Sequence, residues 1–378
     1  TSNSQTGYIN NGTINITGGT LSSGSSAINT SFGTILNNKD ITIDSGIGII
    51  GVNGTKITNN STGTIKVTNS GVGIAGFTSG TSLQAYGTDK LIAAMPPTTL
   101  ASSIKVVDIT NNGAIEVSGT QPIAIYAENN NTSGLVKKEN ISVNNNSKLV
   151  LGDKGIGILV KGAIEGGIIT VTGTGSSDIV TGKNGIGIYA ENSELNLNSN
   201  YGIETKDNGV GIYLSGASNL PTSTTLEYKY SGSTSGVGMG IVYAGSNAAN
   251  STNVNLVNST GTTGGMVGIY ANGGGIFTNS GNITGTSVQM EFGIVGENTA
   301  ISNNGSITLA DAAAITTPNV GIYTKTDNAI TNSGNIAAGN NAIGVYGYEI
   351  NNSGNINIGN AGIGVYSLGG NVNLTGGS

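Results

Sequence analysis

Apolar and polar residues alternate in short runs along most of this chain, and one such run recurs many times. Residues 351–367, NNSGNINIGNAGIGVYS, contain the whole pattern: Ile356 and Ile358 alternate with Asn, a Gly-rich break follows, and Ile363 and Val365 alternate with Gly and Tyr. Period-two alternation places one set of side chains on one face of a β-strand. The pattern therefore predicts short strands separated by turns, in which Asn and Gly supply left-handed backbone conformations.

The second half of this run, an apolar residue, Gly, an apolar residue and often Tyr, is repeated along the chain. Copies begin at Ile47, Val72, Ile156, Ile186, Val210, Met239, Val267, Phe292, Val320, Ile343 and Ile363, and a variant with central Ala begins at Ile123. Successive copies are roughly 20 to 33 residues apart, which is the period of solenoid repeats. The gap between the second copy and the Ala variant is about twice as long, which indicates an insertion.

A second phrase precedes many copies, namely two small polar residues, Gly and an alternating apolar pair, as in Asn332-Ser333-Gly334-Asn335-Ile336. Strands this short are not stable alone. Stacked coils, however, pair every strand with its copies above and below and bury one continuous apolar column. The sequence therefore predicts an all-β fold, a parallel β-helix, with residues 1–378 as a single domain. A propeller needs longer blades of four strands, and helices are disfavoured by so many β-branched residues and glycines.

Residues 78–103 are expected to form an insertion that leaves the coil. Residues 88–97, TDKLIAAMPP, are the one helix-like piece, with a capping residue at the start and two prolines at the end. Solenoid insertions often bind ligands, which makes Asp89 and Lys90 candidate binding residues. The other hypothesis, that the insertion packs over the coil and shields exposed strands, stays open.

Tyr often follows the Gly phrase, at a position that alternation directs outward together with the central Gly if the flanking Ile and Val are inward. The tyrosines at this position are Tyr126, Tyr189, Tyr213, Tyr270, Tyr323, Tyr346 and Tyr366. Stacked coils would align them in an aromatic column beside bare glycine backbone. One hypothesis is a ligand-binding face on which rings stack on sugars or contact a protein receptor. The other is that the stacked rings only stabilise the sheet.

Composition narrows the chemistry. The 378 residues include no Cys, His, Trp or Arg, charged residues make up 9%, and the net charge is −6. The usual general base, phosphate clamp and thiol nucleophile are therefore missing, and so are the best metal ligands. Scattered lysines in an acidic chain argue against nucleic acid as a partner. No apolar run reaches the roughly 18 residues of a membrane span. We expect no cofactor and no metal.

Catalysis by a β-helix on polysaccharide would need paired carboxylates. Glu128, Glu191 and Glu297 each follow a Gly-phrase strand, but in coils that are not adjacent, and we interpret them as solvated turn residues. Calcium-repeat, zinc-protease and nucleophile-elbow motifs do not occur in the sequence. The sequence predicts that the chain is not an enzyme, and a polysaccharide-cleaving β-helix is kept as the catalytic alternative.

Asn-Ser-Gly-Asn-Ile followed by Ile-Gly-Val-Tyr, at residues 332–346 and 352–366, resembles the passenger domains of type V autotransporters. The resemblance is closest to the large, RadD-like outer-membrane adhesins of fusobacteria. It implies a right-handed parallel β-helix at the surface of a Gram-negative cell, either anchored to the outer membrane or secreted. It also implies that this chain is a segment of a longer passenger, whose signal peptide and membrane-anchoring C-terminal β-barrel lie outside it.

Such adhesins attach to protein or glycan receptors on host cells and on other bacteria, so the resemblance implies roles in cell adhesion, coaggregation and virulence. It offers no compact binding motif that transfers to residues of this chain. The alternative is a purely structural stalk that displays a binding domain located elsewhere.

Overall fold

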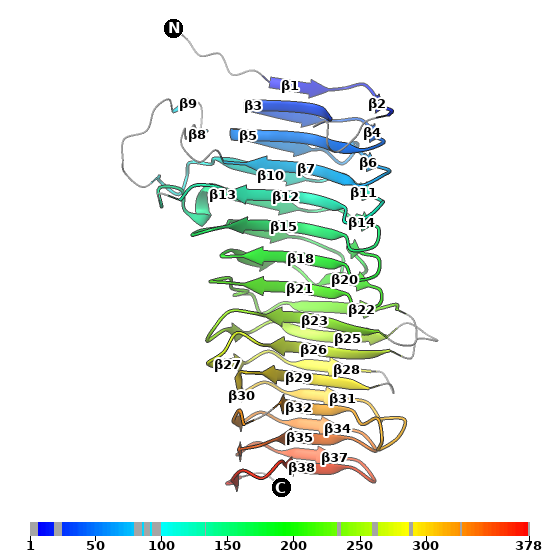
Figure 1. Ribbon diagram of the computed structural model, residues 1–378, viewed down its shortest axis with the longest axis vertical. Helices are drawn as coiled ribbons and strands as arrows, with labels where there is room; N and C mark the ends of the chain where they lie inside the picture. Colours follow the sequence, from blue (N-terminus) through cyan, green and yellow to red (C-terminus); the bar gives the residue numbers. More distant parts are fainter. Residues whose placement is uncertain are drawn as a thin grey trace. The chain divides into compact units, whose positions relative to one another are not determined.

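The computed structural model describes residues 7–18, 25–78, 85–86, 91–92, 100–132, 134–232, 236–258, 264–286, 290–325 and 327–376. The chain divides into two compact units, each described by itself below: unit 1 is residues 1–174 with 178–199, and unit 2 is residues 175–177 with 200–378. In Figure 1 each unit is a stack of short strands connected by turns. That residues 1–378 act as one domain stays a prediction.

Each coil of unit 1 has three sides, and each side pairs in parallel with the same side of the next coil. The first side consists of the first halves of β3 (Ser26–Asn37) and β5 (Gly46–Asn59), then β7 (Gly71–Phe77), β12 (Ile123–Asn129), β15 (Ile156–Gly162) and β18 (Ile186–Glu191). The second side consists of β1 (Gly7–Asn10), the second halves of β3 and β5, β10 (Val107–Asn111), β13 (Ile141–Asn145), β16 (Ile168–Val171) and β19 (Glu194–Leu197). The third side consists of β2 (Ile14–Ile16), β4 (Ile41–Ile43), β6 (Ile65–Val67), β11 (Ile115–Val117), β14 (Leu149–Leu151) and β17 (Ile179–Val180).

Unit 2 repeats this arrangement, again with parallel pairing from coil to coil. Its first side consists of β21 (Val210–Ser215), β23 (Val237–Tyr243), β26 (Gly265–Ala271), β29 (Glu291–Glu297), β32 (Val320–Lys325), β35 (Ile343–Gly347) and β38 (Ile363–Ser367). The second side consists of β24 (Ala249–Asn250), β27 (Ile276–Asn279), β30 (Ala300–Asn303), β33 (Ile330–Asn332), β36 (Ile350–Asn352) and β39 (Val372–Leu374). The third side consists of β20 (Tyr201–Thr205), β22 (Thr225–Tyr230), β25 (Asn253–Asn258), β28 (Ile283–Gly285), β31 (Ile307–Leu309), β34 (Ile336–Ala338) and β37 (Ile356–Ile358).

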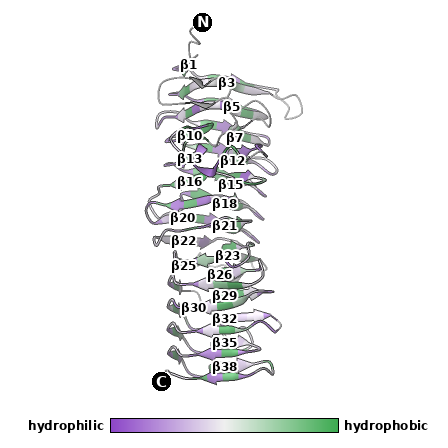
Figure 2. Ribbon diagram, turned by 90° about the vertical axis from the view of Figure 1, so that its left-hand side faces the viewer, coloured by the Kyte–Doolittle hydropathy of each residue, from purple (hydrophilic) through white to green (hydrophobic). Residues whose placement is uncertain are grey.

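The predicted parallel β-helix is therefore confirmed in both units. Apolar residues of successive coils stand opposite one another inside each stack. On the third side of unit 2, for example, Ile307 pairs with Ile336, and both side chains are fully buried. Figure 2 shows the same repetition as hydrophobic segments that recur in β26, β29, β32, β35 and β38. Each coil thus contributes a few apolar side chains to a core that extends along its unit.

The central Gly of the repeated phrase lies on the inside, which makes the expectation of an outward Gly wrong. A Cβ atom on Gly321 would be 2.5 Å from the carbonyl oxygen of Gly344 in the next coil and 2.8 Å from Cγ2 of Ile336 on the third side. Gly and the following Ile or Val are both buried, as in Gly344-Val345. Strict alternation fails here because two consecutive residues face the core.

Buried asparagines form a ladder along the second side of each unit. In unit 2 the amide nitrogen of each Asn donates to the amide oxygen of the next, at 2.7–2.8 Å, through Asn250, Asn279, Asn303, Asn332 and Asn352. Each amide nitrogen also donates to a backbone carbonyl two residues ahead in its own turn. The Tyr243 hydroxyl donates to the first amide oxygen at 3.0 Å. In unit 1 the corresponding ladder is Asn10, Asn37, Asn59, Asn111 and Asn145.

In the asparagine ladders the first Asn of phrases such as Asn332-Ser333-Gly334 faces the core, and no residue of that phrase has a positive φ. Left-handed backbone occurs at other turns, for example at Asn184, where φ is 53°. The prediction that Asn and Gly supply left-handed corners is thus confirmed at some turns and wrong at this one.

The helix predicted at residues 88–97 is wrong at Leu91–Ile92. These residues form β9, which pairs antiparallel with β8 (Ala85–Tyr86), because extended backbone there hydrogen-bonds across a short hairpin. The rest of residues 88–97 lies outside the described residues, as do Asp89 and Lys90. The coil itself has its last described strand before the insertion in β7 and resumes with β10, which pairs with β5.

Helical structure in the described part of the chain is confined to the 3-10 turn η2 (Lys138–Asn140). Among these residues no helix has the length and apolar character needed to cross a membrane.

Candidate functional site

The last position of the repeated phrase, where Tyr often follows apolar–Gly–apolar, points outward. Residues at this position form a column on the first side of each unit. In unit 1, Tyr126 stands opposite Leu159 of the next coil, and Leu159 stands opposite Tyr189. In unit 2 the column runs in the order Tyr213, Val242, Tyr270, Val295, Tyr323, Tyr346 and Tyr366. Six of the seven candidate tyrosines are half-buried, and Tyr366 is 44% exposed. All seven therefore share the outward column, but aliphatic residues separate most of them.

Three tyrosines of consecutive coils are in ring contact, and we call Tyr323, Tyr346 and Tyr366 the aromatic strip. The rings of Tyr346 and Tyr366 are stacked with centroids 4.8 Å apart and planes 3° apart. Those of Tyr323 and Tyr346 are 5.2 Å apart and inclined by 27°. Phe292 meets Tyr323 edge-on at 5.9 Å. Such contacts stabilise neighbouring strands, typically by about 0.5–1.5 kcal/mol per aromatic pair.

Other exposed large side chains lie in the turns that follow two strands of the aromatic strip, β35 and β38. Tyr348 and Leu368 lie two residues beyond Tyr346 and Tyr366, and they are 40% and 44% exposed. Concentrated exposed apolar surface of this kind is typical of interaction sites.

A tyrosine, a glutamate and a lysine form a cluster in unit 1. The Tyr126 hydroxyl donates to the Glu128 carboxylate at 2.5 Å, and the Lys161 ammonium from the next coil lies 3.0 Å from the same carboxylate. Lys161 also lies over the Tyr126 ring, 5.7 Å from its centroid, and Phe77 contacts that ring edge-on. Burial and the neighbouring Glu128 carboxylate raise the pKa of Tyr126 to about 12. The ammonium is held charged, since the hydrogen bond with Glu128 raises the pKa of Lys161.

Unit 2 contains a related cluster on its first side. The Tyr270 hydroxyl donates to the Glu297 carboxylate, and Lys325 of the next coil forms an ion pair with it at 3.0 Å. The hydrogen bond from Tyr270, followed by that from Lys325, lowers the pKa of Glu297. Burial, followed by the Glu297 carboxylate, raises the pKa of Tyr270 to about 12.

The interpretation of Glu128 and Glu297 as solvated turn residues is therefore wrong. Glu128 is the second-last residue and Glu297 the last residue of a first-side strand, and each carboxylate is bound by a tyrosine and a lysine. Each lysine partner lies directly opposite its glutamate in the strand pairing, as Lys161 does for Glu128. The missed signal is thus an acidic and a basic residue at matching positions of successive repeats.

Four further tyrosines, Tyr201, Tyr228, Tyr230 and Tyr243, are fully buried in unit 2 and face the core. Their hydroxyls have polar partners inside, for example Thr205 at 2.6 Å from Tyr228 and Asp207 at 3.1 Å from Tyr230. Buried phenols need such partners, and their role is to fill the core of these coils.

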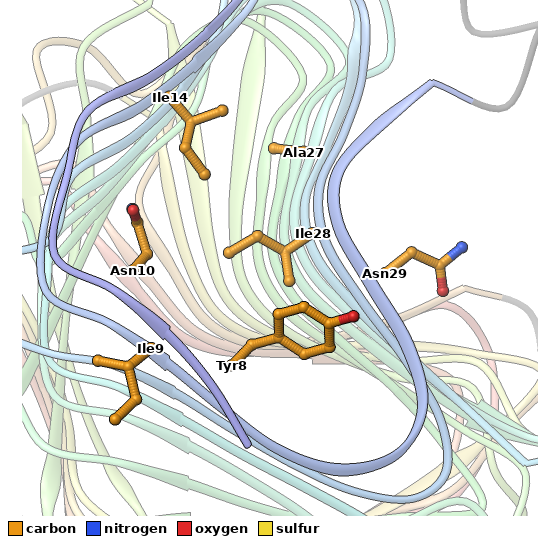
Figure 3. A pocket seen from close by; sticks show the side chains of 7 residues that line it. All are labelled: Tyr8, Ile9, Asn10, Ile14, Ala27, Ile28 and Asn29. Atoms are coloured by element: carbon orange, nitrogen blue, oxygen red, sulfur yellow. The ribbon is translucent and has the colours of Figure 1, made fainter. Parts of the chain in front are cut away.

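A cavity of about 340 Å³ lies at the first described coil of unit 1, lined by Tyr8, Ile9, Asn10, Ile14, Ala27, Ile28 and Asn29. In Figure 3 the Ile14 and Ile28 side chains point into the coil, whereas Ile9 and Asn29 point away from it. Tyr8 stands opposite the buried Ile35, so it occupies a core position although it is 52% exposed. None of these lining residues is charged. The cavity lies where the apolar core ends at the first described coil.

Over the described ranges, no group of three or more acidic side chains is arranged to hold a metal ion. The binding role of Asp89 and Lys90 stays a prediction, because both residues lie outside those ranges. No family model, curated protein or solved structure matches this chain. The fold therefore defines the class of protein, a parallel β-helix, and the outward tyrosine column is its most distinctive surface.

Proposed function

We propose that this chain is an adhesive segment of a bacterial cell-surface protein, and that it attaches to receptors on host cells or other bacteria. The observation that carries the proposal is the aromatic strip, a run of outward tyrosines on a continuous parallel sheet. Tyrosine suits recognition because it gives a large contact area with little loss of conformational entropy. The parallel pairing fixes the spacing of the rings, so little further ordering is needed on binding. The resemblance of the repeats to autotransporter passengers supports a location at the cell surface.

A shallow site of this kind is expected to bind through many weak contacts. Such surfaces gain strength when several are engaged at once, since the second contact is effectively intramolecular. Repetition of the same outward position in coil after coil supports this mode of attachment.

A structural spacer is the second candidate function. Ring contact within the strip favours it, because stacked tyrosines of adjacent strands stabilise a sheet without any ligand. Under this hypothesis the strip contributes to stability and to no binding event.

The two functions are separated by the binding of the purified protein to bacterial cells, to host cells and to immobilised glycans. We expect specific binding that is lost in the double variant Tyr346→Ala/Tyr366→Ala. The matched control is Thr331→Ala/Asn351→Ala, which alters outward residues on the second side of unit 2. If the folded wild-type protein binds nothing, the spacer function is preferred. If both double variants bind like the wild type, the chain is adhesive but the strip is not its binding surface.

A further inference from the structure

The faces of the rings in the aromatic strip are turned toward one another. Tyr346 has Tyr366 stacked on one face at 4.8 Å and Tyr323 on the other at 5.2 Å. Tyr323 also makes a T-shaped contact with Phe292, with ring centroids 5.9 Å apart. A planar ligand cannot stack on a face that a neighbouring ring already covers. At Tyr346, where both faces are covered, the strip therefore presents the ring edge and the phenol hydroxyl to a partner.

The three hydroxyls are available for such a partner. Tyr126 and Tyr270 donate to carboxylates, but no hydroxyl of the strip has a hydrogen-bond partner in the described part of the chain. A phenol hydroxyl both donates and accepts. The strip thus offers one donor and acceptor group per coil, repeated with the spacing of the parallel strands.

The charge around the strip indicates what kind of partner fits. β35 and β38 contain no charged residue. The charge nearest to the strip on its own strands is Lys325, which is paired with Glu297 at 3.0 Å. An anionic or cationic polymer would meet no uncompensated opposite charge on these strands. Its charged groups would lose hydration on binding without gaining an ion pair that offsets this cost.

From these observations we infer that the aromatic strip binds a neutral, hydroxyl-rich polysaccharide. The sugar chain lies along the strip from coil to coil and is held by hydrogen bonds to the hydroxyls of Tyr323, Tyr346 and Tyr366. Ring stacking on the sugars does not contribute at Tyr346. This inference rests on the proposed adhesive function and specifies both the ligand class and the mode of contact.

The test compares two triple variants of the three strip tyrosines in the full chain. Phenylalanine at all three positions keeps the ring contacts and removes only the hydroxyls, whereas alanine removes both. Binding is measured by biolayer interferometry on immobilised dextran, mannan and galactan, with heparin as the anionic probe. Circular dichroism and urea unfolding confirm that each variant is folded.

We expect the wild type to bind at least one neutral polysaccharide with little dependence on salt. The phenylalanine variant should then lose affinity about tenfold or more, because three hydrogen bonds are lost. Retained binding by the phenylalanine variant with loss in the alanine variant would overturn the hydroxyl mode and keep the adhesive function. Preference for heparin with strong salt dependence, or cell binding by the strip without binding to any of the three neutral polysaccharides, would overturn the ligand class. Equal binding by all three proteins would overturn the adhesive role of the strip itself.

Discussion

Asn303, in the middle of the unit 2 asparagine ladder, is the residue at which the stability of the coil is most directly tested. Its side chain is fully buried. The amide oxygen accepts from Asn279 at 2.8 Å, and the amide nitrogen donates to Asn332 at 2.7 Å and to the carbonyl of Gly305 at 2.9 Å. Alanine at this position leaves one donor and two acceptors of the surrounding residues without their partner.

The expected cost follows from these three groups. A buried polar group that loses its partner costs about 1–3 kcal/mol. Three such groups give a range of roughly 3–9 kcal/mol, and relaxation of the adjacent turn reduces it. We therefore expect Asn303→Ala to lower the free energy of unfolding by about 3–5 kcal/mol, which is large for a single substitution.

Two control variants isolate the ladder from the turn. Asn304 is the exposed neighbour, and its amide oxygen accepts only a surface hydrogen bond from Ser333, so Asn304→Ala should cost within about 0.5 kcal/mol. Asn352 ends the ladder, because Leu374 stands opposite it in the next coil. Its replacement removes fewer hydrogen bonds, and an intermediate cost is expected.

Urea unfolding gives the overall change, and hydrogen exchange of the amides of β27, β30 and β33 locates it. The second measurement is needed because coils of a repeat protein can open separately. Comparable urea midpoints and exchange rates for Asn303→Ala and Asn304→Ala would refute the reasoning, since they would mean that the ladder adds no net stability.

Three further predictions concern the glycines and the clusters. Gly321→Ala should lower the free energy of unfolding by roughly 1–3 kcal/mol because the added methyl overpacks the core. Gly364→Ala should be close to neutral in the same urea unfolding measurement, because no atom lies nearer than 4.0 Å to the added methyl. Equal costs would contradict the inward placement of the glycine. Tyr126 has its pKa raised from 10.0 to about 12, so its contribution to stability is full below about pH 10 and is lost as the pH rises through about 12. A Tyr126→Phe variant should therefore remove part of the alkaline loss of stability seen in urea unfolding across this range, and an unchanged profile would contradict the assignment. Tyr270→Phe removes the largest cause of the lowered pKa of Glu297, so carbon NMR titration should show that pKa moving up toward the ordinary value for glutamate, and no movement would exclude the hydrogen bond.

Much of the fold could be predicted because each repeat contains its own inward and outward pattern. The Gly phrase was the exception. Ile343 and Val345 are buried as alternation requires, but Gly344 between them is also buried. The period-two rule assumes a straight strand. Close approach of one coil to the next, which would bring a Cβ atom on Gly344 within 2.5 Å of the Gly364 carbonyl oxygen, is a property of the stack and cannot be read from one repeat.

The asparagine ladder was missed for a related reason. A polar residue beside Ser and Gly, such as Asn332, is typical of an exposed turn. Burial of the asparagine side chain becomes favourable only when the next coil supplies a second side-chain amide at the matching position. The signal exists in the sequence, as an Asn at the same place in successive phrases, but it gains meaning only after the coils are aligned.

The candidate site was predicted in part. The outward column of tyrosines was expected, and the structure adds which of them touch. Contact needs tyrosines in consecutive coils, and Val295 and Leu159 interrupt the column elsewhere. The partners of Glu128 and Glu297 come from the following coil, and coil lengths vary, so pairs such as Glu128 and Lys161 could not be recognised by a fixed sequence spacing.

The asparagine ladder also determines how coils of this kind can be gained or lost. A slip of one residue in the pairing of β30 with β33 would turn Asn332 outward and leave Asn303 opposite Thr331 or Ser333. Only complete turns, aligned amide to amide, are therefore compatible with neighbours already in place. Duplication or deletion of whole coils preserves every lateral contact, whereas insertions of intermediate length must be confined to the corners. Unit 2 can thus change its length in steps of one repeat while its cross-section stays the same.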